Sequence, residues 1–138
     1  MRKLILILVL LFIYNIKAQK IPQYTDVNIC GQEGMAYKYY FQDGNGGVKY
    51  LNIIKEFEKQ FKNNNKAYSD YYRMYTFLNY KNPTDLFITL IPKSIVSEEQ
   101  KKAKDYRVFS DKRILEVSYD LKTKKISKPK PSLILPDL

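Results

Sequence analysis

The sequence predicts an α+β fold, an antiparallel sheet of four to five strands with one long helix packed on one face. Large apolar residues between 48 and 61 recur at steps of three and four, namely Tyr50, Leu51, Ile54, Phe57 and Phe61. That spacing places them on one stripe of a helix. The surrounding chain holds short runs rich in aromatic and β-branched residues, which are typical of strands. A helix with one apolar stripe needs a surface to cover, and the sheet supplies it.

Four runs are predicted as strands, at residues 35–41, 70–80, 86–91 and 114–121. The glycine-rich segment 43–47 is predicted as the turn into the helix, because glycine readily adopts positive φ. Pro83 lacks an N–H for a strand ladder, which predicts a hairpin loop between the second and third strands. Ser97 and Gln100 have the spacing of a capping box and predict the start of a short surface helix.

The predicted order of strand, helix and antiparallel strands resembles the cystatin-like and NTF2-like architectures. The resemblance is one of layout, and no residue-level motif accompanies it. It therefore implies a shape and carries no functional residue to this chain.

The first 18 residues have the pattern of a secretory signal peptide. Arg2 and Lys3 precede an apolar run of 11 residues, 4–14, and Ala18 offers a small residue at a cleavage site. An uncleaved membrane anchor is the alternative, but a span needs ~20 apolar residues. The sequence thus predicts export to the periplasm or the extracellular space, with no stable membrane span after cleavage.

The rest of the chain is predicted as a single α+β domain, 19–128, followed by a Pro-rich C-terminal tail, 129–138. Three prolines and neighbouring lysines favour an extended, poorly ordered tail. The apolar run 133–135 offers an alternative, in which the tail docks on the body as an edge.

The 138-residue chain has a net charge of +10. Removal of residues 1–18 would leave 21 basic and 14 acidic side chains and a net charge of +7. That surplus favours an acidic neighbour, such as a cell-envelope polymer or an acidic protein, or simply keeps the protein soluble. Nucleic acid is not predicted as a partner, because aromatic residues do not alternate with the lysines near the C-terminus.

The residue types limit the chemistry. The chain has no histidine, which excludes Ser-His-Asp and Cys-His nucleophilic sites, and its one cysteine cannot form an intramolecular disulfide. Cys30 lies in an apolar setting and is predicted to be a buried thiol, with pairing between chains as the alternative. We therefore predict no enzyme, no metal and no cofactor. A hydrolase using two carboxylates is the one catalytic alternative.

The faces of the predicted sheet suggest a binding surface. The more apolar side of each strand should face the helix: Tyr37, Tyr39, Met74, Leu78, Leu86, Ile88, Leu90, Leu115 and Val117. The other side is rich in tyrosine and is the predicted binding face, with Lys38, Tyr40, Tyr71, Arg73, Tyr75 and Phe87 as its site residues, accompanied by Thr89, Glu116 and Ser118. The alternative is that the tail or the lead-in covers this face as a second core.

The sequence thus predicts a small exported interaction protein, an inhibitor or immunity-type partner of another protein. The alternatives are a binding module for an acidic cell-envelope polymer and a carboxylate-based hydrolase.

Overall fold

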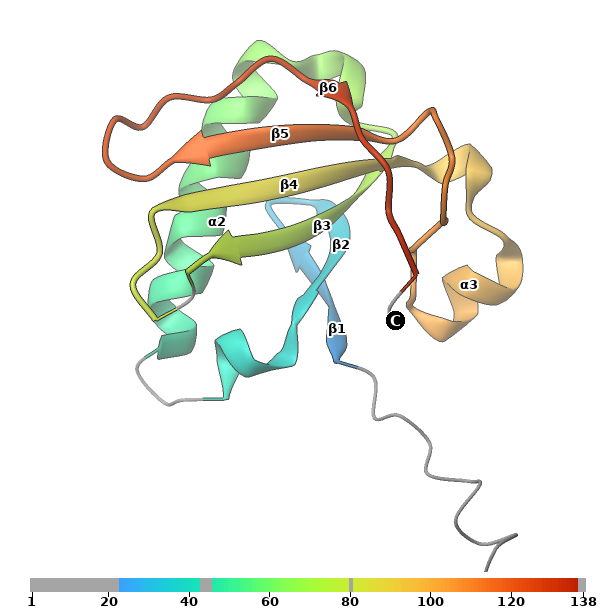
Figure 1. The fold of residues 1–138 in the computed structure, drawn as a ribbon, viewed down its shortest axis with the longest axis horizontal. Coiled ribbons are helices and arrows are strands. Elements are labelled where there is room, and N and C mark those ends of the chain that lie inside the picture. The colour runs from blue at the N-terminus through green and yellow to red at the C-terminus, as the bar shows by residue number, and fades with distance from the viewer. Residues whose placement is uncertain (1–22, 43–45, 80, 137–138) are drawn as a thin grey trace, which may run out of the picture.

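The computed structural model describes residues 23–42, 46–79 and 81–136. Within them, one sheet holds six strands in sequence order: β1 (Tyr24–Ile29), β2 (Gln32–Tyr37), β3 (Tyr71–Leu78), β4 (Asp85–Pro92), β5 (Leu115–Asp120) and β6 (Lys130–Pro131). One long helix, α2 (Gly46–Asn64), lies on one face of this sheet (Figure 1). The predicted α+β fold is confirmed at this level, and the predicted signal peptide lies outside the described residues.

The sheet is antiparallel except at one junction. β2 and β3 run parallel, and every other neighbouring pair is antiparallel. β2 and β3 can run parallel because α2 connects them. The helix carries the chain back to the end of the sheet where β2 began, and β3 then runs in the same direction. The sheet exceeds the predicted four to five strands because a hairpin adds β1 and the C-terminal segment adds β6.

The main core lies between α2 and the sheet. Ile54, Phe57 and Phe61 are completely buried, so the predicted apolar stripe of the helix is confirmed. They share one cluster with Ile88 and Val117, which come from the central strands. Burial of each such side chain contributes roughly 1.5–3 kcal/mol, so this cluster is the main support of the fold.

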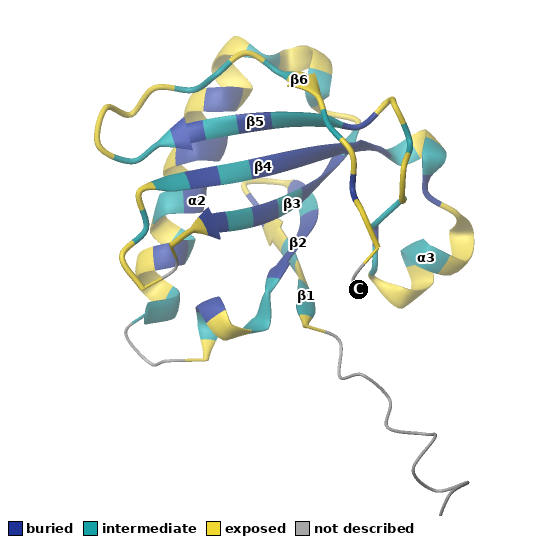
Figure 2. Cartoon of the chain, viewed as in Figure 1, coloured by how far each residue is buried: buried dark blue, intermediate teal, exposed yellow. Residues whose placement is uncertain are grey.

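The opposite face of the sheet is partly covered by the C-terminal half of the chain. A second buried cluster comprises Met35, Tyr72, Ile91, Val96, Tyr106, Ile114 and Ile134. Several of its members flank the short helix α3 (Glu98–Ala103) or lie in the C-terminal segment, and Figure 2 shows these parts of the chain on the same side of the sheet. The capping box predicted at the start of α3 is confirmed, since Ser97 Oγ accepts from the Gln100 N–H and Gln100 Oε1 accepts from the Ser97 N–H.

The C-terminal segment docks on the body. β6 pairs with β5, the Ser132 N–H donates to Ile114 O at 2.9 Å, and the Ser110 N–H donates to Ile134 O at 3.0 Å. Ile134 is buried, so it anchors the segment against the sheet. The edge-docking alternative, and not a poorly ordered tail, therefore describes residues 130–134.

Two local predictions were wrong. The strand predicted at 35–41 ends at Tyr37, and Lys38–Phe41 forms a 3-10 helix, η1, which turns the chain toward α2. Cys30 is exposed, because it lies with Gly31 at the tip of the β1–β2 hairpin, where both residues have positive φ. An apolar neighbourhood in sequence did not reveal that the chain reverses there.

Two further short 3-10 helices, η2 (Lys66–Tyr68) and η3 (Lys93–Ile95), flank β3 and β4. No helix in the described part of the chain combines the length and the apolar character that a membrane crossing needs.

Candidate functional site: a groove on the open sheet face

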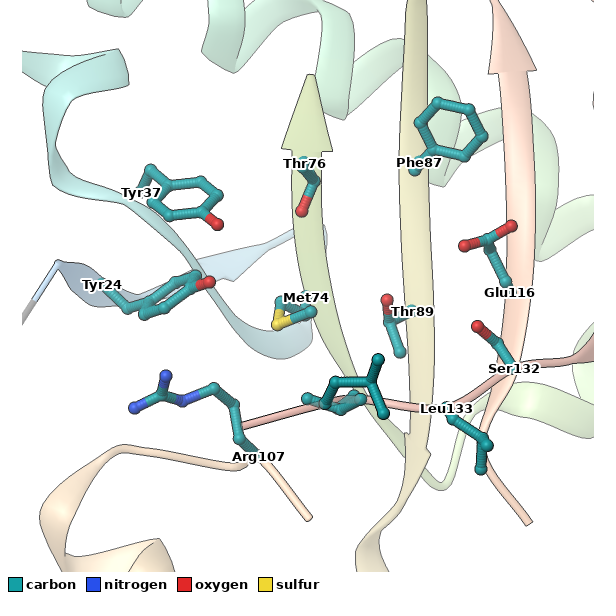
Figure 3. Close-up of a pocket in the computed structure, with 12 residues that line it drawn as sticks. Tyr24, Tyr37, Met74, Thr76, Phe87, Thr89, Arg107, Glu116, Ser132 and Leu133 are labelled. Carbon is teal, nitrogen blue, oxygen red and sulfur yellow. The ribbon is translucent and has the colours of Figure 1, made fainter. Parts of the chain in front are cut away.

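The sheet face opposite α2 carries a groove of about 430 Å³. We call it the open-face groove. Its lining residues come from strands β1 to β5, from the segment that holds Arg107 and from the C-terminal segment, and Figure 3 shows these side chains around the groove. Its lining comprises Tyr24, Tyr37, Met74, Thr76, Phe87, Thr89, Arg107, Glu116, Ser132, Leu133, Ile134 and Leu135.

Strand register builds the floor of the open-face groove. Met74 pairs with Thr89 across β3 and β4, and Thr89 pairs with Glu116 across β4 and β5. Directly paired residues lie on the same face of a sheet, and alternate residues along a strand do so too. Thr76 and Phe87 form the next such pair. The floor is therefore a band of mixed apolar and hydroxyl side chains.

Two tyrosines form one wall of the groove. Tyr24 and Tyr37 are a directly opposed pair on β1 and β2, and their ring centroids lie 4.4 Å apart. The Arg107 guanidinium lies over the Tyr24 ring at 4.8 Å from its centroid, a cation–π geometry. Asp105 holds that guanidinium at 2.8 and 2.6 Å, and this hydrogen bonding lowers the pKa of the Asp105 carboxyl. The wall is thus prearranged by contacts within the chain.

The C-terminal segment forms another wall, and the rim there is apolar. Ile134 is buried, whereas Leu133 and Leu135 are 53% and 68% exposed. Phe109, which pairs with Ile134 in an isolated parallel bridge, is 45% exposed. Large apolar side chains that stay exposed beside a groove are typical of an interaction surface.

The groove also holds a carboxylate and several hydroxyl groups. Glu116 is the one carboxylate among the lining residues, and Lys130 Nζ lies 3.6 Å from its Oε1. Thr76, Thr89 and Ser132 add hydroxyl groups, which donate and accept hydrogen bonds. Among the described residues, no group of three Asp, Glu or Cys side chains is placed to hold a metal ion. The groove therefore combines apolar and aromatic side chains with convergent polar groups, a lining that suits binding.

Three of the predicted site residues lie in the helix-side core, so the predicted face of β3 was wrong. Arg73 and Tyr75 are buried beneath α2, where both contact Glu58. Tyr40 is also completely buried, because η1 turns it inward, and its hydroxyl accepts from the Phe77 N–H at 2.7 Å. None of the three is accessible to a partner on the opposite face.

The other three predicted residues have separate positions. Tyr71 is half-buried and contacts the helix-side cluster, with its ring edge-on to Tyr68. Lys38 lines a different pocket beside β1, and Phe87 lines the open-face groove. Of the six predicted site residues, the groove brings in Phe87 alone, although Thr89 and Glu116 were correctly placed on the face opposite the helix.

One residue of the helix indicates which alternate residues of β3 face α2. Glu58 is four residues after Ile54 and three before Phe61, so it shares their stripe and is buried with them. A buried acid needs a partner, and Arg73 supplies it only if the odd-numbered residues of β3 face α2. Met74 therefore lies in the groove and Leu78 is exposed, while Leu86, Ile88, Leu90 and Val117 face the helix as predicted.

Sequence reasoning missed Tyr24, Arg107 and Ser132 because each belongs to a segment without clear periodicity. Their neighbours in the groove come from distant parts of the chain, and short-range patterns do not report such contacts. Comparisons of the chain with family models, with curated proteins and with solved structures found no match.

Proposed function

We propose that the protein is a small exported binding protein, of the inhibitor or immunity type, whose open-face groove receives an apolar segment of a protein partner. The observation that carries this proposal is the groove itself, a concave surface with one aromatic wall and an exposed apolar rim. Its volume lies within the usual range of ligand pockets, about 300–1,000 Å³.

The composition of the groove favours a protein segment over a polyanion. Tyrosine and arginine are enriched among residues that dominate protein interfaces, and Tyr24, Tyr37 and Arg107 stand together on one wall. The cations beside the groove, Arg107 and Lys130, already lie against Asp105 and Glu116, so they add little attraction for an anionic ligand. Met74 adds an adaptable apolar surface.

The groove does not favour a hydrolase that uses two carboxylates, since such a mechanism needs a facing pair of acids across the scissile bond. Glu116 has no second carboxylate opposite it among the lining residues. Binding, and not hydrolysis, is the activity that the arrangement supports.

A peptide-display selection tests the proposal. A random library is selected on the protein that begins at Gln19, and the enriched peptides are measured against Thr76→Arg. Thr76 lies half-buried on the groove floor, so an arginine there fills the space. We expect enriched peptides to share an apolar anchor and to lose binding to this variant by about tenfold or more, equivalent to 1.4 kcal/mol.

Val48→Arg is the matched control, because it adds the same charge at an exposed position of α2 on the other side of the sheet. It should bind the peptides as the parent does, and both variants should keep the parent's melting temperature. Peptides that bind Thr76→Arg unchanged, or a library that yields no groove-dependent peptide, would overturn the proposal.

A further inference from the structure

A second cleft, of about 400 Å³, lies between the end of α2 and the connection from β5 to β6. We call it the basic cleft. It is lined by Gln60, Asn64, Asn65, Lys124, Lys125, Ile126, Ser127, Lys128 and Pro129. It shares no lining residue with the open-face groove, and no acidic side chain lines it.

The loop that carries the lysines is held in one shape by hydrogen bonds. The Lys124 N–H donates to Asp120 O at 2.8 Å, and the Ser127 N–H donates to Ser118 O at 2.9 Å. Asp120 Oδ1 accepts from two further backbone N–H groups of the turn, each at 2.8 Å, and this lowers the pKa of the Asp120 carboxyl. The lysine positions are therefore defined by the turn and do not depend on a ligand.

Contacts with α2 close the cleft from the other side. Gln60 Nε2 donates to Lys124 O at 3.1 Å, and Lys124 Nζ lies 3.0 Å from Glu56 Oε2. Lys124 has a φ of +58°, a conformation that glycine or asparagine adopts at lower cost. Lys124 pairs with Glu56, and the Asp120 carboxylate accepts from backbone N–H groups of the turn, so no ion pair engages Lys125 or Lys128 among the described residues.

The polar groups of the basic cleft are mainly donors. Lys125 and Lys128 are exposed ammonium groups, each with three N–H bonds. Ser127 Oγ accepts from the Ser118 N–H at 2.9 Å, so the serine hydrogen points elsewhere and can donate. The free carbonyls at the C-terminal end of α2 carry partial negative charge and would repel an anion. One of them, Gln60 O, already accepts a hydrogen bond from Asn64 Nδ2 at 3.3 Å.

We infer that the basic cleft binds phosphate groups carried on an anionic cell-envelope polymer. The charged side chains of the lining are all lysines, which bind phosphate as point charges from any direction. The cleft is larger than one phosphate and so has room for the attached polymer unit. It has no aromatic side chain on which a nucleic acid base would stack, so nucleic acid is not the favoured source of phosphate.

Binding of fluorescent inorganic polyphosphate tests this inference, with the protein that begins at Gln19 and with its Lys125→Gln/Lys128→Gln variant. The double variant should bind at least about tenfold more weakly, because it loses two cationic contacts to a polyanion. Binding to the parent should weaken as salt is raised. The control is Lys102→Gln/Lys112→Gln, which removes two exposed lysines elsewhere and leaves the same net charge.

An equal loss in both double variants would show that net charge alone attracts the polymer and would overturn the inference. Poly-glutamate that binds as tightly as polyphosphate would overturn the choice of phosphate. Single-stranded DNA that binds more tightly at equal charge would overturn the envelope source. Thr76→Arg and Val48→Arg, which add the same charge, should bind polyphosphate equally, so failure of the groove proposal and failure of this one are distinguishable.

Discussion

Arg73 Nε lies 3.1 Å from Glu58 Oε1, and both side chains are almost completely buried between α2 and β3. The same carboxylate oxygen accepts from the Tyr75 hydroxyl at 2.7 Å. Arg73 Nη1 also donates to two backbone carbonyls, Tyr68 O and Tyr71 O, each at 3.0 Å. This network joins the helix to the sheet and determines which side of β3 faces the core.

Removing one partner of this pair should destabilise the protein strongly. Glu58→Leu leaves the Arg73 guanidinium buried without its acid, and such a loss typically costs about 3–5 kcal/mol. Arg73→Met should cost a similar amount, while Glu58→Leu/Arg73→Met should be less destabilised than the sum of the two. Urea denaturation of the parent and the three variants measures this coupling. Additive single effects would contradict a coupled pair.

Stability should also depend on the titration of Glu58. Burial raises the pKa of its carboxyl above the ordinary value of 4.5, despite the attraction of Arg73, so the folded state holds this proton more tightly than the unfolded chain does. The contribution to the free energy of unfolding is therefore full below about pH 4.5 and is lost as pH rises through the folded pKa.

The side chain of the Glu58→Gln variant cannot titrate, so the variant lacks this pH-dependent contribution to the free energy of unfolding. The free energy of unfolding of the parent minus that of the variant should therefore fall as pH rises above about 4.5, as measured by denaturant titrations at each pH. A difference that stays constant over this range would show that the carboxyl has the same pKa in both states.

Tyr40→Phe should cost about 1–3 kcal/mol, because it leaves a buried backbone N–H without its acceptor. The Phe77 N–H donates to the Tyr40 hydroxyl at 2.7 Å, and both side chains are buried. Tyr71→Phe is the control, since the described part of the chain supplies no hydrogen bond to that hydroxyl. Equal melting temperatures of the two variants would contradict the assigned role of Tyr40.

Gly34→Ala should disrupt the parallel junction of β2 and β3. A Cβ atom at Gly34 would lie 2.3 Å from Arg73 O and 2.8 Å from Arg73 Cβ, closer than the packed backbone allows. Gly31→Asn is the contrast, because Gly31 has a φ of +81° and no atom within 4 Å of such a Cβ. Asparagine tolerates positive φ better than most residues, so this variant should lose little stability in the same denaturation assay.

Periodicity predicted the elements with the strongest local patterns. The apolar stripe of α2 was recognisable from Ile54, Phe57 and Phe61 because a helix repeats every 3.6 residues whatever surrounds it. The capping box at Ser97 was also predicted, since its hydrogen bonds join residues three apart. Such features depend on neighbours in sequence and need no knowledge of the rest of the fold.

The face of β3 depended on a distant partner. Both sides of this strand carry large residues, so alternation alone does not choose between Tyr75 and Met74. The choice follows from burial of Glu58, which is offset only when Arg73 lies opposite it. The binding face moved with that choice, and the predicted site residues Arg73 and Tyr75 became core residues.

The amino-acid sequence by itself determined the α+β class, the long amphipathic helix and the absence of histidine chemistry, because composition and short-range spacing are complete before folding. The tertiary structure decided which residues line the open-face groove and the basic cleft. Those surfaces join side chains that are distant in sequence, such as Tyr24 with Arg107 or Gln60 with Lys124. Strand register and the docking of the C-terminal segment bring them together, and both depend on how the whole core packs.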